Sequence, residues 1–331
     1  MPLRFLTASL LGLVLVACSP GAPATPVAQP TQDAQAVQQT ARLRVAFTPG
    51  HSTLPTHAAL TNGYFKQNGL DVTLTEGQDL PTYIAALDKQ FDIALTVAPV
   101  FLNAVAQGVP VKAVAGMQLT VSEPPTNPLL TKDPSINSVK DLGGKTVGGP
   151  TLTGASMMAL QYLLRKNGVD SNSVKLVFVP FPEQADQLNA GRIDAAISAP
   201  PFYVPLLNSG FRNVVDTSAE ATKQATGDPS AVSLNAFYVA SETLVRDHPD
   251  QYRAFRKSLQ QGIDWMKSNQ QDSRAMLQQW LQLSPEVANT SPQPVDAADI
   301  TPEQLQPWIT IMKDTGALKA SIPDAKDLIA P

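Results

Sequence analysis

The chain has 331 residues, of which 43% are apolar and 16% are charged, with a formal net charge of −4 and a pI near 5.4. At roughly 150 residues per domain this length predicts about two lobes, and the apolar share is large enough for a real core. A mildly acidic chain without a basic run has no electrostatic basis for binding nucleic acid. One cysteine and three histidines exclude disulfide frameworks, zinc fingers and thiolate clusters, so we expect no metal and no cofactor.

The amino terminus resembles a bacterial lipoprotein signal. Arg4 precedes an apolar run from Phe5 to Ala17, which as a helix would span about 20 Å, less than the roughly 30 Å of a hydrocarbon core. The run ends in Leu-Val-Ala-Cys, which resembles the lipobox whose cysteine is lipidated and becomes the first residue. A buried free thiol is the alternative, but Cys18 is the single cysteine of the chain. We therefore expect residues 1–18 to be a signal peptide and Cys18 to carry a lipid.

Residues 19–41 are rich in proline, contain no aromatic residue and have Asp33 as their one charge. Such a segment cannot bury enough surface to offset its ordering entropy, so it is expected to be a flexible tether. A lipid followed by a tether would hold the folded part just outside a bacterial membrane, on the periplasmic side or at the cell surface. No later stretch is apolar for long enough to cross a membrane.

Short apolar strands alternate with helical stretches in the first part of the folded chain. Strands are expected at 43–47, 71–75, 92–96 and 111–116, and helices at 55–63, 80–88 and 98–107. Asp79 is a candidate cap of the second of these helices. This alternation predicts a mostly parallel sheet with helices on both faces.

The alternation breaks in two irregular stretches, 119–134 and 216–233. Between them we expect strands at 145–149, 174–179 and 193–198, and helices at 153–166 and 183–190. A strand at 236–240 then precedes mainly helical sequence, at 249–267, 270–283 and 302–315.

The pattern predicts an α/β fold of two α/β lobes joined by two crossovers, with a ligand cleft between the lobes. Residues 42–120 would form the first part of lobe 1, 121–233 lobe 2, and 234–331 the return to lobe 1, on which the carboxy-terminal helices would pack. Contiguous domains split near residue 120 are the alternative.

Five stretches in order carry a resemblance to a known family. They are Gly63–Val72, Ala86–Ala94, Val139–Val147, Leu188–Ala196 and His248-Pro249-Asp250. Together they resemble the solute-binding proteins of bacterial ABC importers, in the NMT1/THI5-like branch that serves sulfonates, nitrate, taurine and thiamine-precursor pyrimidines. The resemblance covers nearly the whole mature chain. It implies the type II periplasmic-binding-protein fold, a monomer that captures a small solute by closing its lobes, and delivery to a membrane permease.

Ligands of open α/β sheets bind at the carboxyl ends of the strands, beside helix amino termini. The most informative of these ends is the turn after 145–149, where Thr153 and Ser156 offer hydroxyls and Gly154 allows close approach to the backbone. Free N–H groups at a helix start suit an anion, although an ordinary helix cap is the plainer interpretation. The resemblance adds Thr48, His51 and Thr96 as contacts from lobe 1.

Lobe 2 offers Ser198 and Tyr203 after its last strand, and an aromatic ring there could stack on a flat ligand or simply pack. Gln118 and Asn235 lie near the expected crossovers and could reach a ligand in the cleft. The stretch Gly144-Lys145-Thr146 imitates a phosphate-binding loop, but Val139 stands where that motif needs glycine.

We expect a receptor rather than an enzyme. The enzymatic relatives that make the thiamine pyrimidine carry a cysteine-rich motif for iron, and this chain has no cysteine after Cys18. A sensory lipoprotein with the same fold is a further alternative. The solute stays open between a small anion, such as a sulfonate or nitrate, and a neutral heterocycle.

Overall fold

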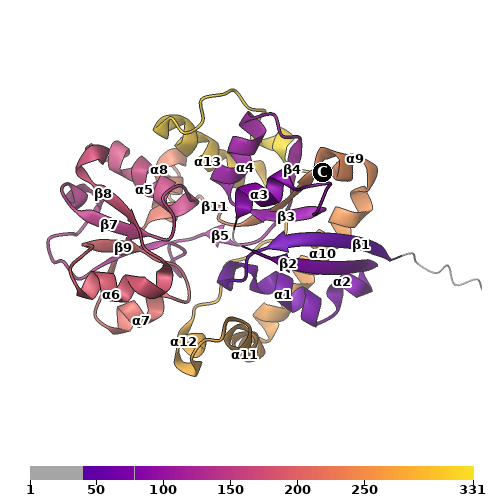
Figure 1. Cartoon of the computed structure of the whole chain (residues 1–331), viewed down its shortest axis with the longest axis horizontal. Coiled ribbons are helices and arrows are strands. Elements are labelled where there is room, and N and C mark those ends of the chain that lie inside the picture. Colours follow the sequence, from indigo (N-terminus) through magenta and orange to yellow (C-terminus); the bar gives the residue numbers. More distant parts are fainter. Residues whose placement is uncertain (1–39, 78) are drawn as a thin grey trace, which may run out of the picture. The chain divides into compact units, whose positions relative to one another are not determined.

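The structure is a computed structural model that describes residues 40–77 and 79–331. The expected signal peptide, the lipidation site Cys18 and nearly all of the tether lie outside these residues. From Gln39 onward the chain forms one compact unit built around two five-stranded sheets (Figure 1).

The first sheet contains a strand from the carboxy-terminal part of the chain. Its order is β2-β1-β3-β12-β4, with β1 at Ala41–Phe47, β2 at Leu70–Glu76, β3 at Ile93–Thr96, β4 at Val111–Gly116 and β12 at Phe237–Ser241. The strands β2, β1 and β3 are parallel, whereas β12 is antiparallel to both of its neighbours. Because β12 pairs between β3 and β4, the alternative of contiguous domains split near residue 120 is wrong.

Helices cover both faces of this sheet, as expected. They are α1 (Leu54–Thr61), α2 (Tyr64–Gln67), α3 (Leu80–Ala85), α4 (Ala98–Ala106), α9 (Glu242–Asp247), α10 (Pro249–Ser268) and α11 (Gln270–Leu281). Two of them, α2 and α9, were not predicted. The Asp79 side chain caps α3 by accepting from the Thr82 N–H at 3.5 Å. The long helix α10 packs against α1, α2 and β4.

The second sheet has the order β10-β6-β9-β7-β8 and forms lobe 2. Its strands are β6 (Pro128–Thr131), β7 (Thr146–Gly149), β8 (Lys175–Phe178), β9 (Ala195–Ile197) and β10 (Arg212–Asp216). Its helices are α5 (Ala155–Lys166), α6 (Gln184–Asn189), α7 (Tyr203–Asn208) and α8 (Thr217–Thr226). The strand β6 lies between β9 and β10 and is antiparallel to both. It therefore has the same place in this sheet as β12 has in the sheet of lobe 1.

Several elements of lobe 2 were not predicted from the sequence, namely β6, β10, α7 and α8. The four residues of β6 begin with proline inside a proline-rich stretch, so neither alternation nor length marks them as a strand. The helix α8 has the polar sequence TSAEATKQAT and buries small residues instead of a hydrophobic stripe. Its signal is the cap, because the Asp216 carboxylate accepts from the Ala219 N–H at 2.8 Å.

The stretches Ala86–Ala94 and Leu188–Ala196 are similar in sequence, and each leads from a helix into a strand, β3 and β9 respectively. Each stretch contains one residue with a left-handed backbone, with φ of 63° at Asp88 and 65° at Gly191, although the two are not at equivalent positions. An aspartate follows, and its carboxylate accepts a backbone N–H from the neighbouring strand: Asp92 from Arg44 and Asp194 from Thr146, both at 2.7 Å. The motif therefore fixes the register of β3 on β1 and of β9 on β7.

Two crossover segments connect the lobes, and a third segment runs alongside them. The strands β5 (Leu119–Thr120) and β11 (Ser233–Leu234) pair antiparallel in the middle of the unit. Residues 295–298 lie antiparallel to 116–119, with backbone N–H···O contacts from Leu119 to Val295 at 2.8 Å and from Ala297 to Met117 at 2.9 Å. Three chain segments therefore meet between the two sheets.

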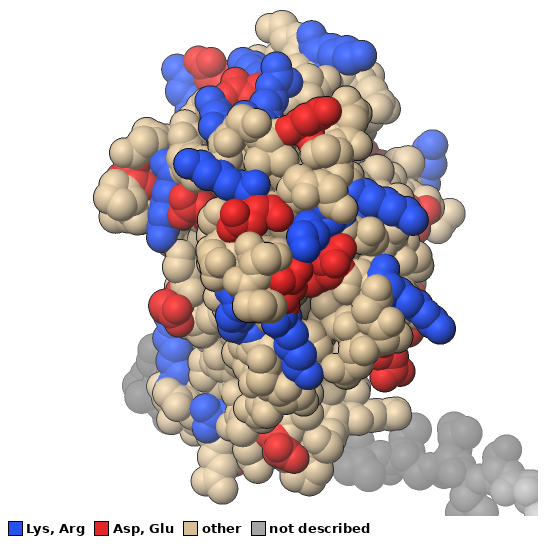
Figure 2. Space-filling model, turned by 90° about the vertical axis from the view of Figure 1, so that its left-hand side faces the viewer, with Lys and Arg blue, Asp and Glu red and all other residues tan. Residues whose placement is uncertain are grey.

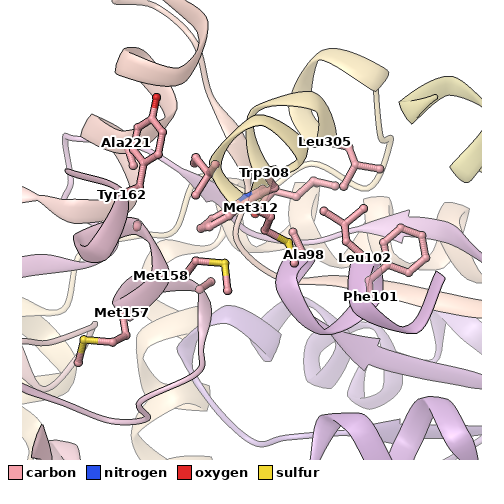
Figure 3. Close-up of a cluster of buried hydrophobic side chains, with 14 of the residues drawn as sticks. Ala98, Phe101, Leu102, Met157, Met158, Tyr162, Ala221, Leu305, Trp308 and Met312 are labelled. Carbon is pink, nitrogen blue, oxygen red and sulfur yellow. The ribbon is translucent and has the colours of Figure 1, made fainter. Parts of the chain in front are cut away.

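The carboxy-terminal helix α13 (Pro302–Thr315) packs on lobe 1, as expected, and also on lobe 2. It contacts α4 on one side and α5 and α8 on the other. In Figure 3, Trp308 and Met312 of α13 lie between Leu102 of α4 and Met158 of α5. The Trp308 indole N–H also donates to the Leu234 carbonyl at 2.7 Å. One continuous hydrophobic cluster therefore extends through both lobes.

Basic and acidic side chains are interspersed on the molecular face that presents lobe 2 (Figure 2). No large patch of one sign is visible on that face. Within the described residues no helix combines the length and apolarity needed to cross a membrane.

Candidate functional site

Two cavities are lined by residues of both lobes. The smaller one, of about 10 Å³, lies beside the crossovers and has room for about one water molecule. His51 from the loop after β1, Gln118 from the first crossover and Pro200 from the loop after β9 line it, together with Thr126 and Pro292. The site therefore brings together the loops that the strand ends predicted.

His51 is buried and has a single hydrogen-bonding partner. Its Nε2–H donates to the Pro292 carbonyl at 2.8 Å, which fixes the tautomer, and its Nδ1 has no partner among the described residues. Burial lowers the pKa of His51 to about 4. The ring is therefore neutral near pH 7 and presents an unused acceptor.

Gln118, Asn235 and Asp296 form a polar cluster on the three segments between the lobes. The Asn235 side-chain amide donates to the Gln118 Oε1 at 2.7 Å, and the Asn235 backbone N–H donates to the Gln118 carbonyl at 2.8 Å. Asp296 pairs with Gln118 across the antiparallel segments and is buried, and its Oδ1 has no partner within residues 40–77 and 79–331. Sequence reasoning found Gln118 and Asn235 but missed Asp296, because nothing in an irregular stretch marks a buried carboxyl.

The larger cavity, of about 310 Å³, lies between the helices α3 and α4 of lobe 1 and the turn before α5 of lobe 2. Its polar residues are Asn103, Gln107 and Thr153. Its apolar lining consists of Pro81, Ile84, Ala85, Pro99, Val100, Ala104 and Val109. Among the described residues, no lysine, arginine, aspartate or glutamate lines either interlobe cavity.

The turn before α5 contributes to the site through one of its three predicted residues. Thr153 is exposed and lines the larger cavity, whereas Ser156 is buried in the first turn of α5. Gly154 is the residue before α5, and an added Cβ would come within 2.3 Å of the Thr151 side chain. The glycine is therefore explained by the local fold of the turn, without any ligand.

Three predicted hydroxyl residues lie at the strand ends, outside the linings of the two cavities. The Thr48 hydroxyl donates to the Gly77 carbonyl at 2.8 Å. Thr96 is fully buried at the end of β3, with only a long 3.4 Å contact to the Val97 carbonyl. Ser198 is fully buried, and its Oγ has no partner among the described residues.

Tyr203 lies in the core of lobe 2, where it packs with Leu130 and Phe211. The preceding residue, Phe202, instead stacks on Phe181, with ring centroids 5.2 Å apart. Phe178, at the carboxyl end of β8, is 60% exposed, and Leu152 in the turn before α5 is 46% exposed. Leu152, Phe178, Phe181 and Phe202 thus follow the strand ends of lobe 2; we call them the apolar rim.

A third cavity, of about 440 Å³, is an open groove formed by α1, α10 and α11 of lobe 1. Trp265 and Trp280 line it, and Trp280 stacks on His57 with centroids 4.4 Å apart. Since one lobe supplies its entire lining, this groove is separate from the interlobe site.

A model of the family described as NMT1/THI5 like matches residues 51–273. The chain belongs to this family. The matched region extends from His51, in the loop after β1, through both crossovers and into α11.

Two binding proteins are among the relatives of this chain. The chain is 27% identical over 272 residues to the riboflavin-binding protein RibY of Chloroflexus aurantiacus, covering 80% of this chain and 74% of the relative. It is 26% identical to a formylaminopyrimidine-binding protein of Halalkalibacterium halodurans, covering 67% and 64%. A relative of 25% identity is a 4-amino-5-hydroxymethyl-2-methylpyrimidine phosphate synthase of Schizosaccharomyces pombe.

Solved structures confirm the predicted fold class. The aliphatic sulphonate binding protein SsuA of Escherichia coli superposes with a TM-score of 0.71 at 16% identity, covering 88% of this chain and 97% of that one. The alkanesulfonate-binding protein SsuA of Xanthomonas axonopodis pv. citri, bound to MOPS, gives a TM-score of 0.68 at 17% identity, covering 86% and 97%. The chain therefore has the periplasmic-binding-protein fold.

Proposed function

We propose that this protein is the extracytoplasmic solute receptor of an ABC importer, and that its solute is a small, flat and uncharged heterocycle. The observation that carries the proposal is the lining of the two interlobe cavities. It combines amides, hydroxyls and a neutral imidazole with proline and aliphatic side chains, and none of the described residues in it is charged.

The absence of a cation from these linings argues against a sulfonate or nitrate. An anion that leaves water loses a large hydration energy, which binding sites offset with arginine, lysine or several converging N–H donors. In the turn before α5, the Thr153 N–H is already engaged by the Thr151 hydroxyl at 3.3 Å. A neutral solute avoids the desolvation cost that this site has little means to offset.

The size and the apolar surfaces of the site suit a ring system. A cavity of about 310 Å³ lies at the lower end of the range for small-molecule sites. The apolar rim supplies the exposed ring of Phe178 and the partly buried rings of Phe181 and Phe202 at the strand ends of lobe 2, and ring stacking contributes about 1 kcal/mol beyond burial. Two curated relatives are named for riboflavin and a formylaminopyrimidine, both of which are heterocycles.

A thermal-shift panel tests the proposal. Riboflavin and a formylaminopyrimidine should raise the melting temperature of the purified protein in a concentration-dependent manner, while taurine and nitrate should not. Gln118→Leu should weaken binding about tenfold because it removes an amide from the site. Gln279→Leu in the single-lobe groove is the matched control and should bind normally. Stabilisation by taurine or nitrate alone would contradict the choice of a neutral solute.

Capture would proceed by lobe closure. A solute that contacts both lobes binds the closed form better than the open form, so it shifts the population towards closure. The closed monomer would then dock on a membrane permease, as the family resemblance implies.

The lipid anchor at Cys18 completes the proposal and rests on the sequence alone. Radioactive palmitate fed to a bacterial expression host should label the wild-type protein and not the Cys18→Ser variant. Equal labelling of both would exclude lipidation at this cysteine.

A further inference from the structure

Asp296 is a buried carboxyl group without an evident structural partner. The residue is 7% exposed, and its Oδ1 makes no hydrogen bond to any described residue. Folded proteins normally pair such a group, because an unsatisfied buried acid lowers the stability of the fold. A group that the fold leaves unpaired in this way is a candidate contact for a ligand.

The register of the neighbouring segments places Asp296 beside the candidate site. Gln118 and Asp296 lie opposite each other in two antiparallel segments. The backbone hydrogen bonds are made by the residues on either side of them, so the two form a non-hydrogen-bonded pair. Side chains of such a pair lie on the same face, with Cβ atoms about 5 Å apart. Gln118 lines the smaller cavity and also accepts from the Asn235 amide. Three polar side chains, one from each interlobe segment, are therefore neighbours.

We propose that Asp296, together with Gln118 and Asn235, reads the hydrogen-bonding edge of the heterocyclic solute and is a specificity-determining residue of the site. The inference rests on the proposed function, which it deepens by naming the chemistry that is recognised: a ring edge with a hydrogen-bond donor beside an acceptor. The cavity next to Gln118 has room for a group about the size of one water molecule, so an edge of the ring, and not the whole solute, would enter this region.

The protonation state of Asp296 suits this role. Burial raises the pKa of Asp296 to about 8, and the Lys267 ammonium at the end of α10 opposes this only in part. Near pH 7 the group is therefore a neutral acid, with an O–H donor and a C=O acceptor side by side. Two nearby side chains leave this state unchanged: His51 is neutral, and the exposed Asp299 lies 4.0 Å from the Arg256 guanidinium.

Binding of riboflavin and of a formylaminopyrimidine, measured by calorimetry between pH 6.5 and 9.5, tests the inference. For wild type, Kd should rise at least about tenfold between pH 7 and 9.5, because the carboxylate that forms has lost its O–H donor. Asp296→Asn keeps a donor beside an acceptor without titrating. Its Kd at pH 7 should stay within about threefold of wild type and should not depend on pH.

Two further variants separate recognition from a structural role. Asp296→Ala should weaken binding about tenfold at pH 7. Asp299→Asn, the same change at an exposed carboxyl on the same segment, should retain the pH dependence of wild type. A wild-type pH profile in Asp296→Asn, or wild-type affinity in Asp296→Ala, would overturn the inference and leave the proposed function standing. If neither probe binds the wild-type protein at any pH, the proposed function fails and the inference fails with it.

Discussion

His51 shows what burial does to a single titratable group at the edge of the site. Its Nε2–H donates to the Pro292 carbonyl, and its Nδ1 has no partner in the part of the chain that the structure describes, so a protonated ring would carry a buried charge and an unpaired N–H donor. This cost lowers the pKa of His51 from 6.5 to about 4. The loop that the sequence offered as a ligand contact therefore also makes folding sensitive to acid.

The pH dependence of unfolding measures this effect. Between pH 4 and 6.5 the unfolded chain binds the His51 proton and the folded chain does not, so stability falls as the pH is lowered through this window. From pH 7 to 4.5, wild type should lose about 2 kcal/mol more than His51→Gln in urea unfolding. His248→Gln, at an exposed ring, should behave as wild type. Parallel pH profiles of wild type and His51→Gln would contradict the assignment.

At the scale of elements, α1 and α10 approach so closely at Gly262 that no side chain fits there. A Cβ on Gly262 of α10 would lie 2.4 Å from the Pro55 carbonyl oxygen and 3.2 Å from the Ala59 nitrogen. Both atoms belong to the backbone of α1, which cannot give way as a flexible side chain would. The glycine thus sets the distance between α10 and the helix that follows the His51 loop.

Gly262→Ala tests this packing, because the sign of the change in unfolding free energy distinguishes a close helix contact from an open helix surface. In an exposed helix the change stabilises by up to about 1 kcal/mol, but here it should destabilise the fold by about 2 kcal/mol in denaturant unfolding. Gly50→Ala is the control, because a Cβ there meets nothing within 4 Å and the backbone is extended, so its stability should change by less than about 0.5 kcal/mol. A stabilised Gly262→Ala variant would show that the helices can separate at no cost.

For the whole molecule, two sheets do not mean two independent folding units. The hydrophobic cluster runs from α4 through α13 to α5 and α8, and Trp308 is its largest fully buried side chain. The contacts of α13 with both lobes join them on the side of the crossovers (Figure 3). The lobes can move relative to each other only to the extent that this shared cluster allows.

Calorimetric unfolding should therefore show one cooperative transition. Trp308→Phe removes the hydrogen bond to the Leu234 carbonyl and part of the buried ring, so it should destabilise the fold by about 2 kcal/mol and lower that single melting temperature by several degrees. Trp265→Phe, in the open groove, should shift it by much less. Two resolved transitions in wild type would show that the lobes unfold separately.

The alternation of strands and helices could be predicted wherever an element has a local sequence pattern of its own. β1 to β4, β7 to β9 and the long helices combine apolar runs with caps and glycine stops, and the structure confirms them. β6 and α8 were not readable, since a four-residue strand starting with proline and a polar helix acquire their burial only from their neighbours. The limits of the lobes at 42–120, 121–233 and 234–331 stay a prediction.

The sequence by itself determined the family and the α/β class, because local patterns and short motifs follow from the order of residues along the chain. The loops proposed for a ligand stay a prediction. Only the tertiary structure decided which side chains of those loops meet. Tyr203 turned into the core while Phe202 and Phe178 remained at the rim, and Asp296 came to lie beside Gln118. The physical reason is that burial and the loss of hydrogen-bond partners depend on neighbours distant in sequence, which no local pattern records.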